Sequence, residues 1–316
     1  MKFDMITLGS ATVDYFVYTD ADLIEIKNID SEKELLAYPL GSKILIKELH
    51  TFTGGGGTNT AVGFSRLGLK TGFIGNLGND EQAGIILKEL KKEKVKFLGL
   101  KSEEYKTGFS IILDSFADDR TILVYKGAND FLDFNKVKQN LNNVETKALY
   151  VSSLVKNSFD AGLKIIKYFK EKGAVVFYNP SSYVVSLGLN KLLTYIKHID
   201  YLIVNKEEAQ TLLGLNKELE LKELSFEVFN KTKKPICITD GKNGAGFFDG
   251  NKFYKKPARK VKVKEKTGAG DAFSVGFVYG ILKGKDYNTC LKYGILNSDA
   301  VIKEIGAKNN LRSSFD

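Results

Sequence analysis

The sequence predicts an α/β protein with a largely parallel central sheet. From residue 148 onward, short apolar runs typical of strands alternate with helical segments. Such alternation indicates a parallel sheet whose two faces are covered by helices. The chain has 316 residues, of which 43% are hydrophobic, which suits one large α/β domain with a small appendage. Glycines gather at 54–57, 241–250 and 268–270, where we expect specialised turns.

The N-terminal part combines strands with two helices. Residues 5–9 form an apolar run that predicts a buried strand, and Thr58–Leu67 is expected to be a helix followed by a strand at Lys70–Ile74. Asp80–Glu93 carries apolar residues on one side and lysines on the other, which predicts an amphipathic helix. The apolar positions of that helix are Ile85, Ile86, Leu87 and Leu90.

Two β-rich regions, residues 15–50 and 107–126, do not fit the alternation. The second contains two strand-like runs joined at Ala117-Asp-Asp119, which predicts a hairpin. If the two regions pair, they form a small sheet that has no helices of its own and needs a cover. A substrate cleft or a second subunit would supply that cover.

The remaining chain follows the α/β pattern closely. The expected strands are 148–152, 174–178, 201–204 and 235–239, and the expected helices between them include 158–172, 187–198 and 207–213. Residues 244–256 predict an antiparallel pair at the end of the sheet. Two long helices, 269–283 and about 286–304, complete the chain.

Composition excludes several classes of protein. The formal charge is +9, but only four of the 47 basic residues are arginines and the lysines are scattered, unlike the basic stripe of a nucleic-acid-binding protein. Cys237 and Cys290 lie alone in apolar runs, which predicts buried thiols rather than disulfides or zinc ligands. No apolar stretch approaches about 18 residues, and the N-terminus does not resemble a signal peptide. We therefore expect a cytoplasmic protein without a membrane span.

The segment Thr267-Gly-Ala-Gly-Asp271 precedes an apolar run with helical spacing. A helix start presents unpaired N–H groups and about half a unit of positive charge, and residues 268–270 are small enough for an anion to approach closely. Asp271 would lie beside that anion, where it could accept a proton from an attacking hydroxyl. This arrangement suits phosphoryl transfer to an alcohol. The alternative is an ordinary loop with an N-cap aspartate.

Other polar residues follow predicted strands, and ligands of open α/β sheets bind beyond the carboxyl ends of the strands. These positions are Asp14, Gly54–Gly57, Asn59, Asn205, Glu208, Thr239, Asp240 and Gly241. Each has a structural alternative: Asp14 could cap a turn, and Asn205 with Glu208 could form a capping box. Their joint placement favours a binding site. Gly63-x4-Gly68-Leu-Lys-Thr is one residue too long for a P-loop.

The motifs and their order resemble those of the ribokinase-like (PfkB) carbohydrate kinases over nearly the whole chain. The matching segments are Leu8–Asp14, Gly54-Gly-Gly-Gly-Thr-Asn59, Gly75–Asp80, Thr107-Gly-Phe-Ser, Asp119–Asn129, Asn179-Pro180, Asn205-x-x-Glu208, Thr239-Asp-Gly-x-x-Gly244 and Thr267–Phe273. The resemblance implies a three-layer αβα sandwich with a mostly parallel central sheet and a small β-sheet lid. On this basis residues 1–14, 51–106 and 127–316 form the main domain, and residues 15–50 and 107–126 form the lid.

The resemblance also implies roles for individual residues. Asp271 would be the general base for a CH2–OH group, and the N–H groups of Gly268, Ala269, Gly270 and Asp271 would hold the γ-phosphate. Asp14 would accept hydrogen bonds from acceptor hydroxyls, and Gly54, Gly55 and Asn59 would hold others. Asn205 and Glu208 would organise Mg²⁺, mostly through water. Thr239, Gly241 and Gly244 would line the ATP site, and Asn297 would approach the adenine.

Several departures leave the details open. Glu265-Lys266 stands where the family usually has Asp-Thr, near a region that often helps bind a monovalent cation. Lys266 could replace that cation's charge, cation activation could be lost, or Lys266 could simply face solvent. Ribokinase usually has other residues at Thr12, Gly56 and near Leu154, so the resemblance leaves open which sugar or nucleoside is the acceptor.

The resemblance leaves other functions open as well. An ADP-dependent or vitamin kinase, or a catalytically silent sugar-binding regulator, are alternatives, and a nicotinamide-dependent oxidoreductase is the weakest rival. We expect small-molecule partners, no nucleic acid, and a homodimer formed through the lid.

Overall fold

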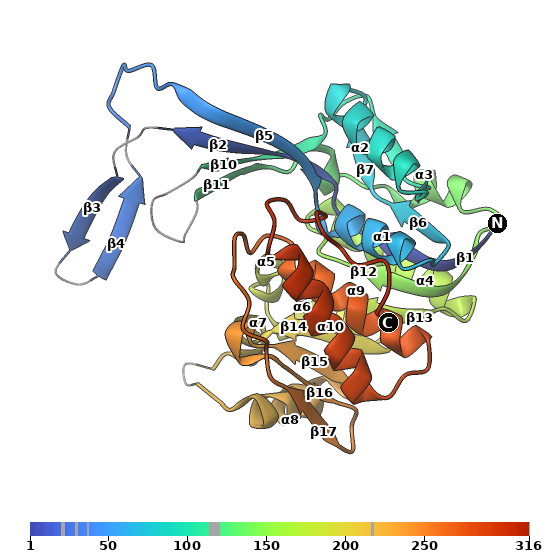
Figure 1. Ribbon diagram of the computed structural model, residues 1–316. Helices are drawn as coiled ribbons and strands as arrows, with labels where there is room; N and C mark the ends of the chain where they lie inside the picture. Colours follow the sequence, from blue (N-terminus) through green and yellow to red (C-terminus); the bar gives the residue numbers. More distant parts are fainter. Residues whose placement is uncertain (20–22, 29–30, 37, 114–120, 216–217, 316) are drawn as a thin grey trace.

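A large central sheet with helices on both faces forms the body of the molecule (Figure 1). The computed structural model describes residues 1–19, 23–28, 31–36, 38–113, 121–215 and 218–315. The strands of the central sheet are β1 Lys2–Leu8, β6 Thr71–Ile74, β8 Lys96–Phe97, β12 Glu145–Val151, β13 Val175–Tyr178, β14 Tyr201–Asn205, β15 Ile236–Thr239, β16 Ala245–Phe248 and β17 Phe253–Lys256. Their order within these residues is β17-β16-β15-β14-β13-β12-β1-β6-β8.

The central sheet is mostly parallel, as predicted. From β8 to β15 all neighbouring strands pair in parallel, and β16 and β17 add an antiparallel pair at one edge. Strand β12 is an example of why these strands are apolar at every position. Successive residues of a strand point to opposite faces of the sheet, and both faces are covered here. Leu149 and Val151 belong to one core cluster and Tyr150 belongs to another on the opposite face. Both faces are therefore buried.

Ten helices are seen in the described residues, and they divide between the two faces of the sheet. Their bounds are α1 Gly56–Arg66, α2 Glu81–Lys92, α3 Phe134–Asn140, α4 Asn157–Glu171, α5 Ser182–Val185, α6 Leu189–Ile196, α7 Lys206–Leu213, α8 Leu221–Thr232, α9 Ala269–Leu282 and α10 Tyr287–Val301. Helices α1, α9 and α10 contribute to the core that contains Tyr150. Helices α4, α6, α7 and α8 contribute to the core that contains Leu149 and Val151.

Two sequence predictions about helices were wrong in detail. Ile85 is 42% exposed, whereas Ile86 and Leu90 of the same helix α2 are buried. The predicted helix 187–198 is shorter, because α6 begins after Gly188, its N-cap with φ 88° and ψ 158°, and ends at Ile196. A backbone with this positive φ is easily reached by glycine.

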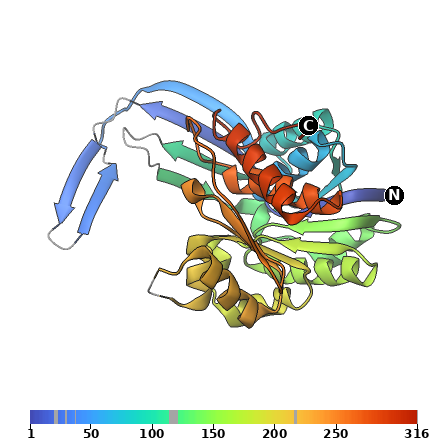
Figure 2. The ribbon, with the colours of Figure 1, turned by 60° about the horizontal axis from the view of Figure 1, so that its bottom comes forward.

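A small sheet projects from the central sheet, and both views show it extending away from the body (Figures 1 and 2). Its described strands are β2 Thr12–Thr19, β5 Ile46–Gly54, β10 Gly108–Leu113 and β11 Thr121–Tyr125, in the order β11-β10-β2-β5. The predicted pairing of the two β-rich regions is thus confirmed. The strands also include residues 12–14 and 51–54, which the sequence pattern places in the main domain. The turn at 117–119 lies outside the described residues.

Two short two-stranded pairs complete the described strands. Strands β3 Leu23–Asn28 and β4 Ser31–Leu36 form a hairpin at the far end of the small sheet, and β7 Asn76–Gly78 pairs with β9 Leu100–Ser102. Cys237 and Cys290 are buried and unbridged, as predicted. No helix in the described parts of the chain is both long and apolar enough to cross a membrane.

Helices α9 and α10 approach each other closely at Gly276. A Cβ atom there would lie 2.3 Å from the carbonyl oxygen of Tyr293 and 2.6 Å from its carbonyl carbon. Because these atoms belong to the backbone, the helices would have to move apart. We expect Gly276→Ala to lower the free energy of unfolding by about 1–3 kcal/mol, as measured by urea denaturation.

Gly84→Ala is the matched control for this substitution. Gly84 also lies inside a helix, α2, but its Cβ would meet nothing within 4 Å. Alanine there should raise the free energy of unfolding by about 0.5–1 kcal/mol. Equal effects of the two substitutions would show that close packing at Gly276 is unimportant.

Candidate active site

Two pockets meet at the start of α9. The larger, of about 720 Å³, is lined by Ala269 and Gly270. The smaller, of about 290 Å³, is lined by Asp271. Since these three residues are consecutive in the first turn of one helix, a group held by the helix start in the larger pocket would lie beside a group held by Asp271 in the smaller one.

The start of α9 depends on Gly268. This residue is the N-cap, with φ 81° and ψ −2°, and a Cβ on it would lie 2.5 Å from Cβ of Ala307. Only glycine suits both the left-handed backbone and the close contact. The alternative of an N-cap aspartate is wrong, because Asp271 lies inside the first turn.

The first turn of α9 leaves few N–H groups for an anion. The Ala269 N–H donates to the carbonyl oxygen of Lys266 at 3.1 Å. Among the described residues, the donors that remain there are the N–H groups of Gly270 and Asp271. Helix starts with free N–H groups attract anions, so this end of the larger pocket is suited to a phosphate group.

Asp271 is held by a residue from a distant part of the chain. Asn59 of α1 donates a hydrogen bond from Nδ2 to Asp271 Oδ2 at 2.8 Å. Burial raises the pKa of Asp271, while the hydrogen bond from Asn59 and the charge of Lys308 oppose that rise. A carboxylate with a raised pKa is a better proton acceptor, and Asn59 fixes the direction in which it points.

Asp14 lies at the base of the small sheet, behind the glycine turn that leads into α1. Its side chain is buried, and burial raises its pKa, although hydrogen bonds with Thr12 and Ser110 lower it. A Cβ on Gly54 would lie 1.9 Å from Asp14 Oδ2, and one on Gly55 would lie 2.6 Å from the Ser10 carbonyl oxygen. Gly54 therefore allows this turn to approach the carboxylate, and Gly55 allows it to pack against the backbone of Ser10.

Asn205 and Glu208 form the predicted capping box at the start of α7. Glu208 also lines the smaller pocket and is 7% exposed. Its Oε1 accepts a hydrogen bond from Ser182 at 3.1 Å, and its Oε2 accepts one from the Asn205 N–H at 2.9 Å. Burial raises the pKa of Glu208, and those hydrogen bonds lower it.

The carboxylate of Glu208 fits a loosely held Mg²⁺ ion. An ionised carboxylate has about four acceptor sites in all, so beside its hydrogen bonds to Asn205 and Ser182 it can still accept one from a water of the ion. Mg²⁺ usually retains several waters and binds one or two carboxylates plus phosphates. The described residues contain no group of three acidic, histidine or cysteine side chains arranged around a metal. The donor set therefore suits an ion held through water and phosphate oxygens.

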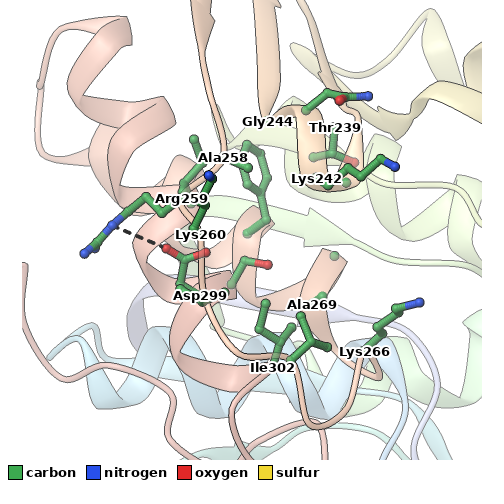
Figure 3. Close-up of a pocket in the computed structure, with 18 residues that line it drawn as sticks. Thr239, Lys242, Gly244, Ala258, Arg259, Lys260, Lys266, Ala269, Asp299 and Ile302 are labelled. Carbon is green, nitrogen blue, oxygen red and sulfur yellow. Dashed lines mark ion pairs between the residues drawn. The ribbon is translucent and has the colours of Figure 1, made fainter. Parts of the chain in front are cut away.

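The larger pocket contains most of the residues expected near a nucleotide. Thr239, Gly241 and Gly244 line it from the turn between β15 and β16. Figure 3 shows Lys242, Lys260 and Lys266 around the same space. The loop before α9 and the helix α10 supply the opposite walls. Positive charge around a pocket with a free helix start favours an anionic ligand.

Asn297 does not lie in this pocket, contrary to the expectation from sequence. It is fully buried, its Nδ2 donates to the Ala272 carbonyl oxygen at 2.7 Å, and its Oδ1 accepts from the Arg312 N–H at 3.0 Å. Its side chain joins α10 to α9 and to the C-terminal segment. The next residues, Ser298 and Asp299, line the pocket instead.

Glu265 and Lys266, which stand where the family usually has Asp-Thr, lie in different surroundings. Glu265 is 2% exposed and accepts hydrogen bonds from the N–H groups of Thr267 and Gly306. It thus ties the turn before α9 to the loop after α10. Lys266 is exposed and lines the larger pocket.

Asp130 is a site residue that the sequence motifs did not indicate. It lies in a turn after β11, is 2% exposed and lines the smaller pocket. Its Oδ2 pairs with Lys156 Nζ at 2.6 Å, whereas its Oδ1 has no hydrogen-bond partner among the described residues. Lys126, Ser152, Ser153 and Asn179 line the same pocket. Only the fold brings these scattered residues together.

Comparisons with known proteins identify the family of the chain and its fold. The family model described as pfkB family carbohydrate kinase matches residues 20–313. An uncharacterized sugar kinase from Archaeoglobus fulgidus is 28% identical over 81% of this chain and 100% of its own length. Ribokinase from Lactococcus lactis is 27% identical over 86% of each chain. The structure of Arabidopsis thaliana ribokinase complexed with ribose and ATP has a TM-score of 0.77 at 21% identity, covering 97% of this chain and 95% of that one. The predicted fold class is confirmed.

Proposed function

Because this chain belongs to the pfkB family of carbohydrate kinases, we propose that it transfers the γ-phosphate of ATP to a primary hydroxyl of a sugar or a nucleoside. The observation that carries the proposal is the meeting of two pockets at Gly270 and Asp271. The larger pocket is taken as the donor pocket and the smaller one as the acceptor pocket.

The start of α9 offers one group for the transferred phosphate and another for the acceptor hydroxyl. Phosphoryl transfer depends on positioning and on stabilising the charge of the transferred group. The N–H groups of Gly270 and Asp271 would hold the γ-phosphate oxygens. The Asp271 carboxylate would take the proton of the acceptor hydroxyl as its oxygen bonds to phosphorus and the bond to the β-phosphate oxygen breaks. ADP would then leave from the donor pocket.

Other residues would support these steps. Glu208, with Asn205 behind it, would hold the waters of a Mg²⁺ ion, which would neutralise phosphate charge when bound. Asp14, Asn59 and the glycine turn would bind acceptor hydroxyls; of these only Gly56 lines the acceptor pocket itself, so the others would act at its edge next to the small sheet. The small sheet would act as a lid over the acceptor.

The lining of the acceptor pocket favours a sugar over a nucleoside. It is rich in hydroxyl, amide and charged groups, and no aromatic ring lines it among the described residues. A nucleobase would need an apolar or aromatic surface, whereas sugar hydroxyls need donors and acceptors such as Asn179 and the free Oδ1 of Asp130. The names of the relatives, ribokinase and sugar kinase, point the same way.

Asp271→Asn tests the proposed base. Turnover should fall by about 10²–10⁴, the usual contribution of general-base catalysis, while ATP still binds. In the wild type, kcat/KM should fall as the pH drops through the raised pKa of Asp271, because a protonated carboxyl cannot accept the proton. ADP release would be followed with a panel of sugars and nucleosides. Glu207→Gln, at an exposed position, is the control, and near-normal turnover of Asp271→Asn would refute the assignment.

Lys266 is proposed to supply positive charge beside the phosphates. Lys266→Met should raise the KM for ATP by about tenfold, the loss expected for one hydrogen bond to a charged group. Lys264→Met is the control, since Lys264 is exposed and pairs with Glu304 at 3.4 Å. Assays with and without K⁺ should differ little, and strong stimulation by K⁺ would contradict this role.

The small sheet is proposed to form a homodimer. Ile46 and Leu49 of β5 and Ile122, Leu123 and Val124 of β11 are 47–55% exposed. These are the two edge strands of the small sheet within the described residues, and exposed apolar edge strands favour pairing with another chain. Light scattering should give twice the chain mass of 35.1 kDa. Leu49→Lys with Leu123→Lys should give a monomer, whereas Leu187→Lys on the main body should not. A monomeric wild-type protein would disprove this proposal.

A further inference from the structure

The donor pocket contains a buried carboxylate for which the proposed function has no role. Asp299 of α10 lines this pocket and is only 8% exposed. Its Oδ2 has no hydrogen-bond partner among the described residues. The Nε atom of Arg259 lies 3.8 Å away, which is within range for an ion pair but too long for a hydrogen bond. Figure 3 shows the two side chains together at one side of the pocket.

The position of Asp299 matches the place of a nucleotide base. If the phosphates lie at the start of α9, the base must occupy the space farther along the pocket. One wall of that space is formed by Ile295, Ser298 and Asp299 of α10 and by Ile302 at its C-terminal end. Their spacing of three and four residues puts them on one face of the helix. Phe273 and Val261 add apolar surface on which a planar base can pack.

Asp299 Oδ2 lacks a hydrogen-bond donor within the part of the chain that the structure describes. Burial raises the pKa of Asp299, whereas the charges of Arg259 and Lys303 hold it down. Those two cations favour the charged form of the carboxylate, which only accepts hydrogen bonds. A buried acceptor without a partner is costly, and a ligand with donors in the right place would remove that cost.

The two purine bases differ in what they offer to a carboxylate. Guanine has an N1–H and an N2–H₂ side by side, so both carboxylate oxygens can accept. Adenine has its N6–H₂ beside N1, which is itself an acceptor and would face a carboxylate oxygen. Guanine also has O6 and N7, which pair well with an arginine such as Arg259.

We propose that Asp299 recognises the base of the phosphate donor and that this protein uses GTP at least as well as ATP. This rests on the proposed function, because it takes the larger pocket as the site of the donor. The interaction adds GTP to the donors rather than excluding ATP, since the apolar walls serve either base.

The test compares kcat/KM for GTP and ATP with one accepted sugar. In the wild type the value for GTP should equal or exceed that for ATP. In Asp299→Asn it should fall by about 10–100-fold for GTP, the loss of one or two hydrogen bonds to a charged group. The value for ATP should hold or rise, because an asparagine offers both the acceptor and the donor that the adenine edge needs. Glu304→Gln, an exposed change beyond the end of α10, should alter neither.

A binding measurement without acceptor separates this inference from the proposed function. GDP and ADP affinities would be measured by calorimetry for the wild type and for Asp299→Asn, with thermal unfolding as the check on folding. Tighter binding of GDP, reversed in the variant, would support base recognition even if no acceptor were phosphorylated. A wild-type kcat/KM for GTP clearly below that for ATP would overturn the inference and leave the kinase assignment intact. Equal effects of Asp299→Asn on both nucleotides would also overturn it.

Discussion

The hydrogen bond between Asn59 and Asp271 is the contact on which the site depends. It joins residues that are 212 positions apart and places the first turn of α9 against the first turns of α1. Because the base of the small sheet leads directly into α1, the same contact sets the distance between the acceptor region and the helix start. Gly268 makes it feasible, since any side chain there would collide with Ala307.

Burial of acidic groups is the second constraint on this site. Burial raises the pKa of Asp14, Glu208 and Asp271. Above its ordinary pKa each of these carboxylates therefore lowers the stability of the folded protein, and that cost disappears as the pH falls and the groups become protonated. Hydrogen bonds from Asn59, Ser182 and the Asn205 N–H offset part of this cost. The buried carboxylates that would accept the proton and bind polar ligands thus lower the free energy of unfolding.

The loop after α10 connects three separate regions of the molecule. Lys308 is 4% exposed and donates to Thr53 Oγ1 at 2.6 Å and to Glu89 Oε2 at 2.7 Å. Two residues earlier, the Gly306 N–H donates to Glu265 at 3.1 Å. The loop therefore links strand β5 of the small sheet, helix α2 and the turn before α9. These contacts couple the position of the small sheet to the position of the turn that precedes α9.

The sequence by itself determined the α/β class, the order of most elements and the small group of residues at Gly268–Asp271. These follow from local properties, namely apolar periodicity, glycine turns and helix-start chemistry, which a linear chain displays directly. It also indicated the capping box of Asn205 and Glu208, because that motif is complete within four residues. Only the tertiary structure decided that Asn297 is internal while Asp299 faces the donor pocket, and that Asp130 faces the acceptor pocket. The direction of a side chain on a helix or turn depends on which neighbours pack against it, and those neighbours come from distant parts of the chain.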